Sequence, residues 1–145
     1  MEKLILSLNV GSTSVKSKLF AIKKGNELKE VFSWSESDLR ENIKKEAVLR
    51  RLFSHLEKDG LADRVIGVAH RVVHGGEMSR SVFVDGRLVY FLHRISHLAP
   101  LHNPFNLEGI VFARLHWPKA KQVAVFDTAL FADLPERTRF YPIPL

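Results

Sequence analysis

One glycine, three hydroxyl side chains and a lysine are clustered in residues 9–16. A short loop of small residues lets backbone N–H groups approach a phosphate, and hydroxyl groups and a lysine charge strengthen the attraction. The loop lacks the second glycine and the Gly-Lys-Ser/Thr ending of a Walker A motif. An ordinary hairpin with a solvent-facing lysine fits the same residues. The candidate phosphate-binding residues are Gly11, Ser12, Thr13, Ser14 and Lys16, and Asn9 precedes them as a candidate for a phosphate or a metal-bound water.

A second candidate, Arg71, lies inside an apolar run that ends at Gly75 and Gly76. If this run is a strand, Arg71 and Val73 face one side and His70 faces the other. An arginine at a strand end can bind a carboxylate or phosphate through two parallel hydrogen bonds, and the two glycines would let a ligand approach the backbone. The alternative is a surface arginine beside a turn, but an arginine within an apolar run needs a partner.

Two more polar residues follow the same logic. His102 stands between two prolines, ahead of an expected helix whose N-terminal end favours anions. Asp127 comes directly after a short apolar strand, where an acid suits proton transfer, metal binding or orientation of a partner. The alternatives are a structural histidine in a capping segment and an aspartate that caps the next helix.

Composition narrows the classes of protein. The 145 residues are 46% hydrophobic and 26% charged, which is typical of a globular domain. The absence of cysteine excludes disulfides, cysteine-zinc sites and thiol catalysis. No apolar run is long enough for a transmembrane helix, and the N-terminus does not resemble a signal peptide, so we expect a cytoplasmic protein without membrane partners. The net charge of +6 is dispersed and lacks a nucleic-acid motif, so we expect no nucleic-acid partner.

The periodicity predicts how these residues are positioned. Alternating apolar residues predict strands, and apolar residues at helical spacing predict helices. Asp85-Gly86, between alternating residues, is a typical hairpin turn. The expected elements are strands at residues 4–10, 15–22 and 28–34, a helix capped by Ser37 or Asp38 and ending at Gly60, a strand at 65–73, a hairpin at 81–91, a helix capped by Asn103, and a strand at 123–126.

This order predicts an α/β fold with an antiparallel meander and parallel strands separated by helices. We expect a mixed five-stranded sheet with flanking helices and an inserted hairpin. All four candidate motifs follow strands or precede a helix, and ligands in such folds bind beyond the carboxyl ends of the strands.

Together the motifs resemble the acetate kinase family, within the superfamily of actin-like ATPases with a ribonuclease H-like fold. The resemblance extends over nearly the whole chain, and the block around Arg71 is its most specific part. The four blocks stand in the family order, at residues 9–16, 69–77, 98–104 and 125–129.

The resemblance implies phosphoryl transfer between ATP and acetate, with Mg²⁺, giving acetyl phosphate and ADP. By position, Asn9 resembles the family's magnesium-site asparagine, and Lys16 its phosphate-loop lysine. Arg71 resembles the arginine that holds acetate or acetyl phosphate, and His102 a histidine that lines the site. Asp127 resembles the aspartate assigned as catalytic acid or base. Such transfer needs positioning and charge neutralisation more than covalent chemistry.

The family's enzymes are longer and have two related domains with the site between them. Their next motif, His-Gly-Thr-Ser-His, has no match here. We therefore expect residues 1–145 to form a single N-terminal domain without its C-terminal domain, and to show negligible turnover alone. A complementing C-terminal chain or a second copy would then be a partner. Phe140, Tyr141, Ile143 and Leu145 are candidates for an exposed face that such a partner covers.

Two other interpretations stay open. The chain could be a non-catalytic module that binds acetyl phosphate or another anion, or that docks onto a complete kinase. It could also be a degenerate remnant, although the joint presence of Asn9, Lys16, Arg71, His102 and Asp127 speaks against long decay.

Overall fold

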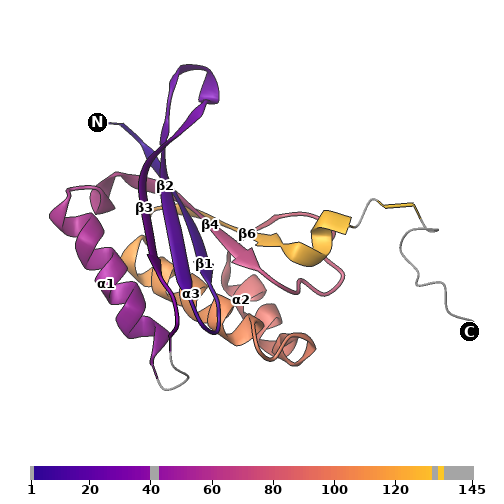
Figure 1. The fold of residues 1–145 in the computed structure, drawn as a ribbon. Coiled ribbons are helices and arrows are strands. Elements are labelled where there is room, and N and C mark those ends of the chain that lie inside the picture. Colours follow the sequence, from indigo (N-terminus) through magenta and orange to yellow (C-terminus); the bar gives the residue numbers. More distant parts are fainter. Residues whose placement is uncertain (1, 40–42, 132–133, 136–145) are drawn as a thin grey trace, which may run out of the picture.

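The structure is a computed structural model that describes residues 2–39, 43–131 and 134–135. Six strands and three α-helices follow one another along these residues, with short 3₁₀ turns between them (Figure 1). Their bounds are β1 Leu4–Val10, β2 Val15–Ile22, β3 Leu28–Glu36, α1 Lys45–Lys58, β4 Val65–Val72, β5 Val82–Phe83, α2 Gly86–Arg94, α3 Asn103–His116 and β6 Lys121–Phe126.

The strands form one mixed sheet in the order β3-β2-β1-β4-β6-β5. The first three strands are an antiparallel meander, as the sequence predicts. Strands β1, β4 and β6 run parallel to one another. Helices connect these parallel strands, so their carboxyl ends meet at one edge of the sheet.

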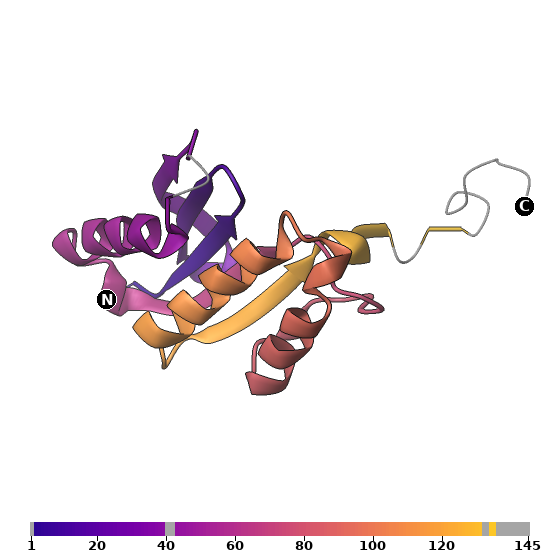
Figure 2. The same cartoon turned by 90° about the horizontal axis from the view of Figure 1, so that it is seen from below.

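The helices pack on one face of the sheet. Leu4, Leu6, Leu8 and Val10 are buried in β1 at every second position, because alternate side chains point to the same face. These residues form one core cluster with the apolar sides of α1 and α3, and β4 and β6 form a second cluster with α2 and α3. Figure 2 shows α3 lying between α1 and α2. Val125, which pairs with Arg71 on the opposite face, is 44% exposed.

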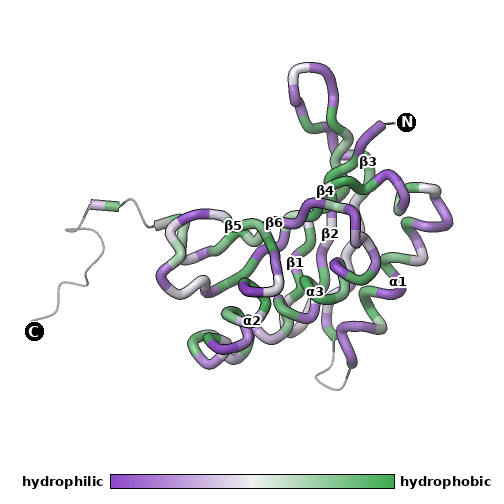
Figure 3. Tube along the Cα trace, turned by 180° about the vertical axis from the view of Figure 1, so that it is seen from behind, coloured by the Kyte–Doolittle hydropathy of each residue, from purple (hydrophilic) through white to green (hydrophobic). Residues whose placement is uncertain are grey.

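The hydropathy of the trace follows the same division, with green apolar segments along the central strands and purple polar segments in the turns (Figure 3). No helix among the described residues is long and apolar enough to cross a membrane. The four apolar residues expected to form an exposed C-terminal face lie outside the described residues.

The prediction of a hairpin at residues 81–91 is wrong. Asp85 instead caps a helix, and its carboxylate accepts a hydrogen bond of 2.7 Å from the Leu88 N–H. Leu88 and Leu92 are four residues apart and are both buried, so helical spacing decides the structure. The preceding residues form the short strand β5, antiparallel to β6, and the sheet therefore has six strands rather than five.

The expected start of the first helix is also wrong. Asp38 has a positive φ of 57°, and α1 begins at Lys45 without a side-chain cap. The Leu39 N–H donates to the Thr13 carbonyl at 3.0 Å, and the Leu39 side chain is buried. These contacts hold this segment against the β1–β2 turn, so it does not open a helix. The third helix begins one residue earlier than expected, with His102 rather than Asn103 at the cap position.

Candidate active site at the carboxyl edge of the sheet

Three of the predicted site residues lie side by side across the sheet. Lys16 stands opposite Asn9 in the β1–β2 pair. Leu8 pairs with His70 at the end of the β1–β4 ladder, so Asn9 and Arg71 follow on neighbouring strands. All three side chains point to the face away from the helices, since residues in register share a face. The sheet therefore forms a polar row at its carboxyl edge.

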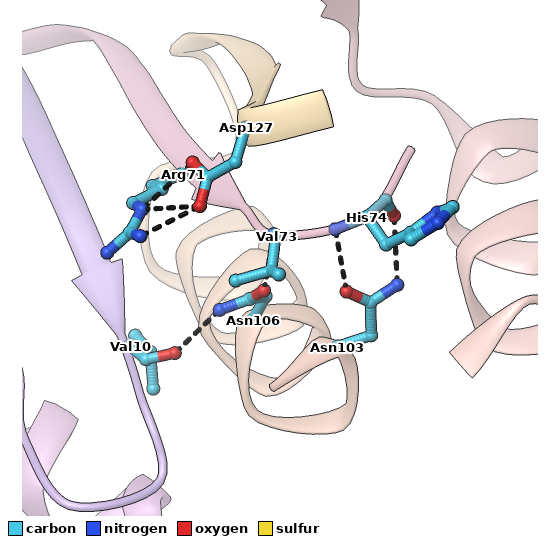
Figure 4. A network of polar contacts seen from close by, with 7 residues as sticks. All are labelled: Val10, Arg71, Val73, His74, Asn103, Asn106 and Asp127. Carbon is cyan, nitrogen blue, oxygen red and sulfur yellow. Dashed lines mark hydrogen bonds and ion pairs between the residues drawn. The ribbon is translucent and has the colours of Figure 1, made fainter. Parts of the chain in front are cut away.

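Arg71 finds its partner in Asp127. The Arg71 Nε donates to both carboxylate oxygens, at 2.9 and 3.1 Å, and Nη2 donates to Oδ2 at 2.7 Å. Asp127 is the first residue after β6, and β6 pairs with the strand that carries Arg71. Figure 4 shows the two side chains facing each other at the strand ends. Arg71 therefore has the carboxylate partner that the sequence predicts, but it lies at the surface and not in the core.

The ion pair leaves part of Arg71 open to a ligand. A guanidinium has five N–H donors, and Asp127 engages those on Nε and one on Nη2. The hydrogen bond to Asp127 raises the pKa of Arg71, so the side chain stays cationic. Its side chain is 54% exposed, and that of Asp127 39%. The remaining donors can hold a carboxylate or phosphate while Asp127 fixes the orientation of the arginine.

The expected phosphate loop is a tight turn between β1 and β2. The Gly11 N–H donates to the Ser14 carbonyl at 2.8 Å, and Thr13 accepts from the Leu39 N–H at 3.0 Å. The Gly11 amide is therefore occupied within the turn. Hydroxyl groups on Ser12, Thr13 and Ser14 supply polar groups to this loop, beside the polar row.

The two glycines after β4 allow close packing as well as a turn. A β-carbon on Gly75 would stand 2.5 Å from the Phe126 ring, so this close approach is to the core and not to a ligand. The Gly75 N–H donates to Thr128 Oγ1 at 3.2 Å, next to Asp127. Gly76 has a positive φ of 64°. These contacts fix the ends of β4 and β6 relative to each other.

His102 lies just ahead of α3 and is exposed. Its backbone belongs to the turn, because the His102 carbonyl accepts from the Asn106 N–H at 3.0 Å. Its side chain makes no capping hydrogen bond. Among the described hydrogen bonds and ion pairs, none joins its ring to Arg71 or Asp127, so the structure places His102 near this edge without joining it to the pair.

Sequence reasoning missed two buried asparagines on α3. Asn106 donates to the Val10 carbonyl at 2.7 Å and accepts from the Val73 N–H at 3.0 Å. Asn103 accepts from the His74 N–H at 3.1 Å and donates to the His74 carbonyl at 2.9 Å. The sequence signal that could have found them is a pair of asparagines three residues apart at the start of a helix. This spacing puts both side chains on one side of the helix.

His70 belongs to the core and not to the site. Its Nε2 lies 2.9 Å from Gln122 Oε1, in the buried layer beneath the helices. Burial lowers the pKa of His70 to about 4, since the charged form loses its hydration. At neutral pH the ring is therefore uncharged, and it contributes a packed polar pair.

The described residues do not form a magnesium site by themselves. Within residues 2–39, 43–131 and 134–135 no three His, Cys, Asp or Glu side chains are grouped to hold a metal. Asn9 offers one amide oxygen, and the Asp127 carboxylate is engaged by Arg71. Mg²⁺ prefers six oxygen ligands, and it often takes several from water and substrate phosphates.

A hollow of about 600 Å³ lies elsewhere, on the helix side of the molecule. Its walls are mainly apolar side chains of α1 and α3, such as Leu49, Val111 and Leu115. Burial raises the pKa of Glu108 at this hollow. None of the predicted site residues lines it, and apolar walls do not suit a phosphate, so the candidate site remains the polar edge.

Comparison with known proteins decides the family. The family model described as the acetokinase family matches residues 4–145. The chain belongs to the acetokinase family. The curated acetate kinase of Shewanella oneidensis is 38% identical to it over 98% of this chain and 41% of that protein. This acetokinase-family chain thus spans about two fifths of the length of the curated relatives it matches.

Comparison with solved structures also leads to the acetokinase family. A propionate kinase from Francisella tularensis matches with a TM-score of 0.73 and 32% identity, over 98% of this chain and 41% of the other. The acetate kinase of Porphyromonas gingivalis matches with a TM-score of 0.69 and 28% identity, over 99% and 42%. The mixed sheet with its helices is therefore the actin-like ATPase fold of these acetokinases, and the α/β class and fold family expected from the sequence are confirmed.

Proposed function

We propose that this chain contributes the carboxylate-binding side of an acetate kinase-type phosphotransferase, which transfers a phosphoryl group between ATP and a short carboxylate. The observation that carries the proposal is Arg71, held by Asp127 at the carboxyl edge of two parallel strands with donors left for a ligand. A fixed cation at this edge would bind acetate or acetyl phosphate and offset the charge of the transferred group.

We propose roles for the other predicted residues around the Arg71–Asp127 pair. Lys16, with the loop of Gly11, Ser12, Thr13 and Ser14, would bind ATP phosphates beside Asn9. His102 would line the carboxylate side, and Asp127 would serve as acid or base in addition to orienting Arg71. We propose that Mg²⁺ enters with ATP, because the described residues provide Asn9 at the polar row but no ligand set of their own.

The substrate class is a short carboxylate. Similar proteins include an acetate kinase and a propionate kinase, and an enzyme distinguishes substrates that differ by one methylene by only about 10–200-fold in kcat/KM. We therefore propose acetate or propionate as the acceptor. We also propose that the activity is cytoplasmic, where ATP is abundant.

We propose that turnover needs the lobe that the longer relatives carry beyond the matched region. The test mixes this chain with the remaining part of the Shewanella oneidensis acetate kinase and measures ADP formation with acetate or propionate. We expect no turnover for this chain alone and carboxylate-dependent turnover for the mixture. Turnover by this chain alone would show that it needs no second lobe.

Arg51 provides a matched control for Arg71. It also binds a carboxylate through Nε and Nη2, that of Glu36, on another part of the surface. Arg71→Ala should remove acetyl phosphate binding measured by titration calorimetry, and Arg51→Ala should leave it unchanged. Equal binding by both variants would remove Arg71 from the site. Arg71-dependent binding without turnover in the mixture would instead identify an anion-binding module.

A further inference from the structure

We propose that Asn106 is a positioning residue that joins the loop of residues 11–14 and the strand end carrying Arg71 into one anion-binding unit. The inference rests on the proposed function, because it concerns how that site is assembled. Asn106 itself would not contact the substrate, since its side chain is 4% exposed and bonded to backbone on both sides.

The amide of Asn106 bridges two strands beyond the point where they pair. Val10 is the last residue of β1, and Val73 follows the last residue of β4. The ladder between these strands ends at Leu8 and His70. Past that point, Asn106 Nδ2 donates to the Val10 carbonyl and Oδ1 accepts from the Val73 N–H (Figure 4). The side chain therefore extends the connection between β1 and β4 by about two residues.

Gly109 lets the helix come close enough to make this bridge. A β-carbon at Gly109 would stand 2.6 Å from Val10 Cγ2, a distance that real side chains do not adopt. Gly109 lies three residues after Asn106, so both residues face β1 from the same side of α3. The close approach of helix and strand brings the Asn106 amide to 2.7 Å from the Val10 carbonyl.

The bridge matters because the loop has no other described anchor to β4. Gly11 bonds to Ser14 within the loop, and Thr13 bonds to Leu39 on the opposite side. Val10 directly precedes the loop, whereas Val73 lies two residues after Arg71. Holding Val10 and Val73 on one amide therefore sets the distance between the loop and the arginine. Acetyl phosphate bound at Arg71 would carry to the loop the phosphoryl group that it exchanges with ATP, so its binding to both needs this distance fixed.

Asn103 is a matched control on the same helix. It is also buried, at 2% exposed, and it also makes two hydrogen bonds to backbone. Both of these bonds go to His74, so Asn103 holds the turn after β4 without contacting β1. Asn103→Ala and Asn106→Ala thus remove the same number of bonds, but only the second removes the bridge.

The test is a titration of the ¹⁵N-labelled chain with inorganic phosphate and with acetyl phosphate, followed by amide chemical shifts. In the wild type and in Asn103→Ala, residues 11–14 and 71–76 should report one shared dissociation constant. In Asn106→Ala the two segments should report different constants, with an overall affinity about tenfold weaker. Exchange of the Val73 amide should accelerate only in Asn106→Ala, because that amide loses its acceptor.

The proposal is overturned if residues 11–14 and 71–76 report one shared dissociation constant in Asn106→Ala. It is also overturned if the dissociation constants of the two segments differ as much in Asn103→Ala as in Asn106→Ala. If the wild type binds neither ligand, the proposed function fails, and the ligand-free spectra then decide the role of Asn106. Asn106→Ala should shift the resonances of residues 11–14 and Asn103→Ala should not, and unshifted loop resonances overturn the inference. If Asn106→Ala does not fold, Asn106→Asp keeps the acceptor for Val73 and removes the donor to Val10. The same changes in dissociation constants and loop resonances are then expected, but exchange of the Val73 amide should stay slow.

Discussion

The carboxylate of Asp127 covers the Nε edge of the Arg71 guanidinium, with contacts of 2.9, 3.1 and 2.7 Å, and leaves Nη1 outside the pair. Two functions can therefore be separated at this site. The free donors of Arg71 suit an incoming anion, and the carboxylate of Asp127 orients the arginine. In the proposed function, Arg71 binds the ligand and Asp127 acts on the reaction, so the two roles can be tested separately.

Asp127→Asn should separate binding from turnover. The amide keeps an acceptor for Arg71 but removes the carboxylate charge, so acetyl phosphate affinity should change by less than about threefold while turnover of the complemented enzyme falls at least about tenfold. Calorimetry and ADP formation measure the two quantities. Normal turnover in this variant would exclude the catalytic role. Stability should change by less than about 1 kcal/mol, since the pair is exposed to solvent.

His70 should make the fold sensitive to acid. Its pKa is about 4 in the folded chain and about 6.5 when exposed. The unfolded state therefore binds more protons between these values, and stability falls as the pH drops from 6.5 towards 4. The shift corresponds to about 3 kcal/mol at 1.36 kcal/mol per pKa unit. Urea unfolding at pH 7 and pH 5 should show about 2 kcal/mol of this loss, since most of the titration of the unfolded state lies between these values.

His70→Gln is the control for this effect, because glutamine can hydrogen-bond to Gln122 but does not titrate. The variant should lose much of the stability difference between pH 7 and pH 5. An unchanged pH dependence would assign the acid sensitivity to other groups.

Gly75→Ala should destabilise the fold. The new β-carbon would stand 2.5 Å from Phe126 Cγ, so the ring or the turn must shift, at a cost of about 1–3 kcal/mol. Gly86→Ala is a matched control, because nothing lies within 4 Å of its β-carbon position and alanine suits a helix better than glycine. Thermal unfolding should show a lower midpoint for the first variant only, and an equal midpoint for both would contradict the close contact.

Asp85→Ala should weaken α2 by about 1 kcal/mol, since it removes the cap on the Leu88 N–H. Asp85→Ser keeps an acceptor at this position and should restore most of the stability. The pair also tests the helix against the hairpin expected from the sequence. Two-residue hairpins of the Asp-Gly type need φ > 0 at both residues, which serine supports poorly, so a loss with both substitutions would favour the hairpin.

Most strands of the sheet could be predicted from the sequence, because the alternation of apolar and polar residues is a local signal. The apolar residues of β1 recur at every second position and are buried accordingly. The strand that carries Arg71 is predicted from a run of β-favouring apolar residues at 65–73. The parallel arrangement also follows from the order of strands and helices. The sequence predicts a partner for Arg71, because a cation within an apolar run is expected to be buried. The structure gives Arg71 a carboxylate partner but leaves its side chain 54% exposed, so burial does not require the pair.

The errors arose where two local signals compete. Asp85-Gly86 fits a hairpin turn and also a helix cap, and only the burial of Leu88 and Leu92 against the core decides between them. The start of α1 depends on a hydrogen bond from Leu39 to Thr13, a contact between segments far apart in the sequence. The role of Asn106 could not be predicted for the same reason, because its partners lie on two other strands.

The parallel centre of the sheet also sets the order in which the chain can fold. The β1–β2–β3 meander forms from contacts between neighbouring segments, whereas β1 must wait for β4, and β4 must wait for β6. Such contacts between segments far apart in the sequence slow folding, because the entropy of closing a long loop is lost before the strands pair. Arg71 meets a carboxylate 56 residues further along. During synthesis, the Arg71–Asp127 pair at the carboxyl edge is therefore completed only after β6 and Asp127 have left the ribosome.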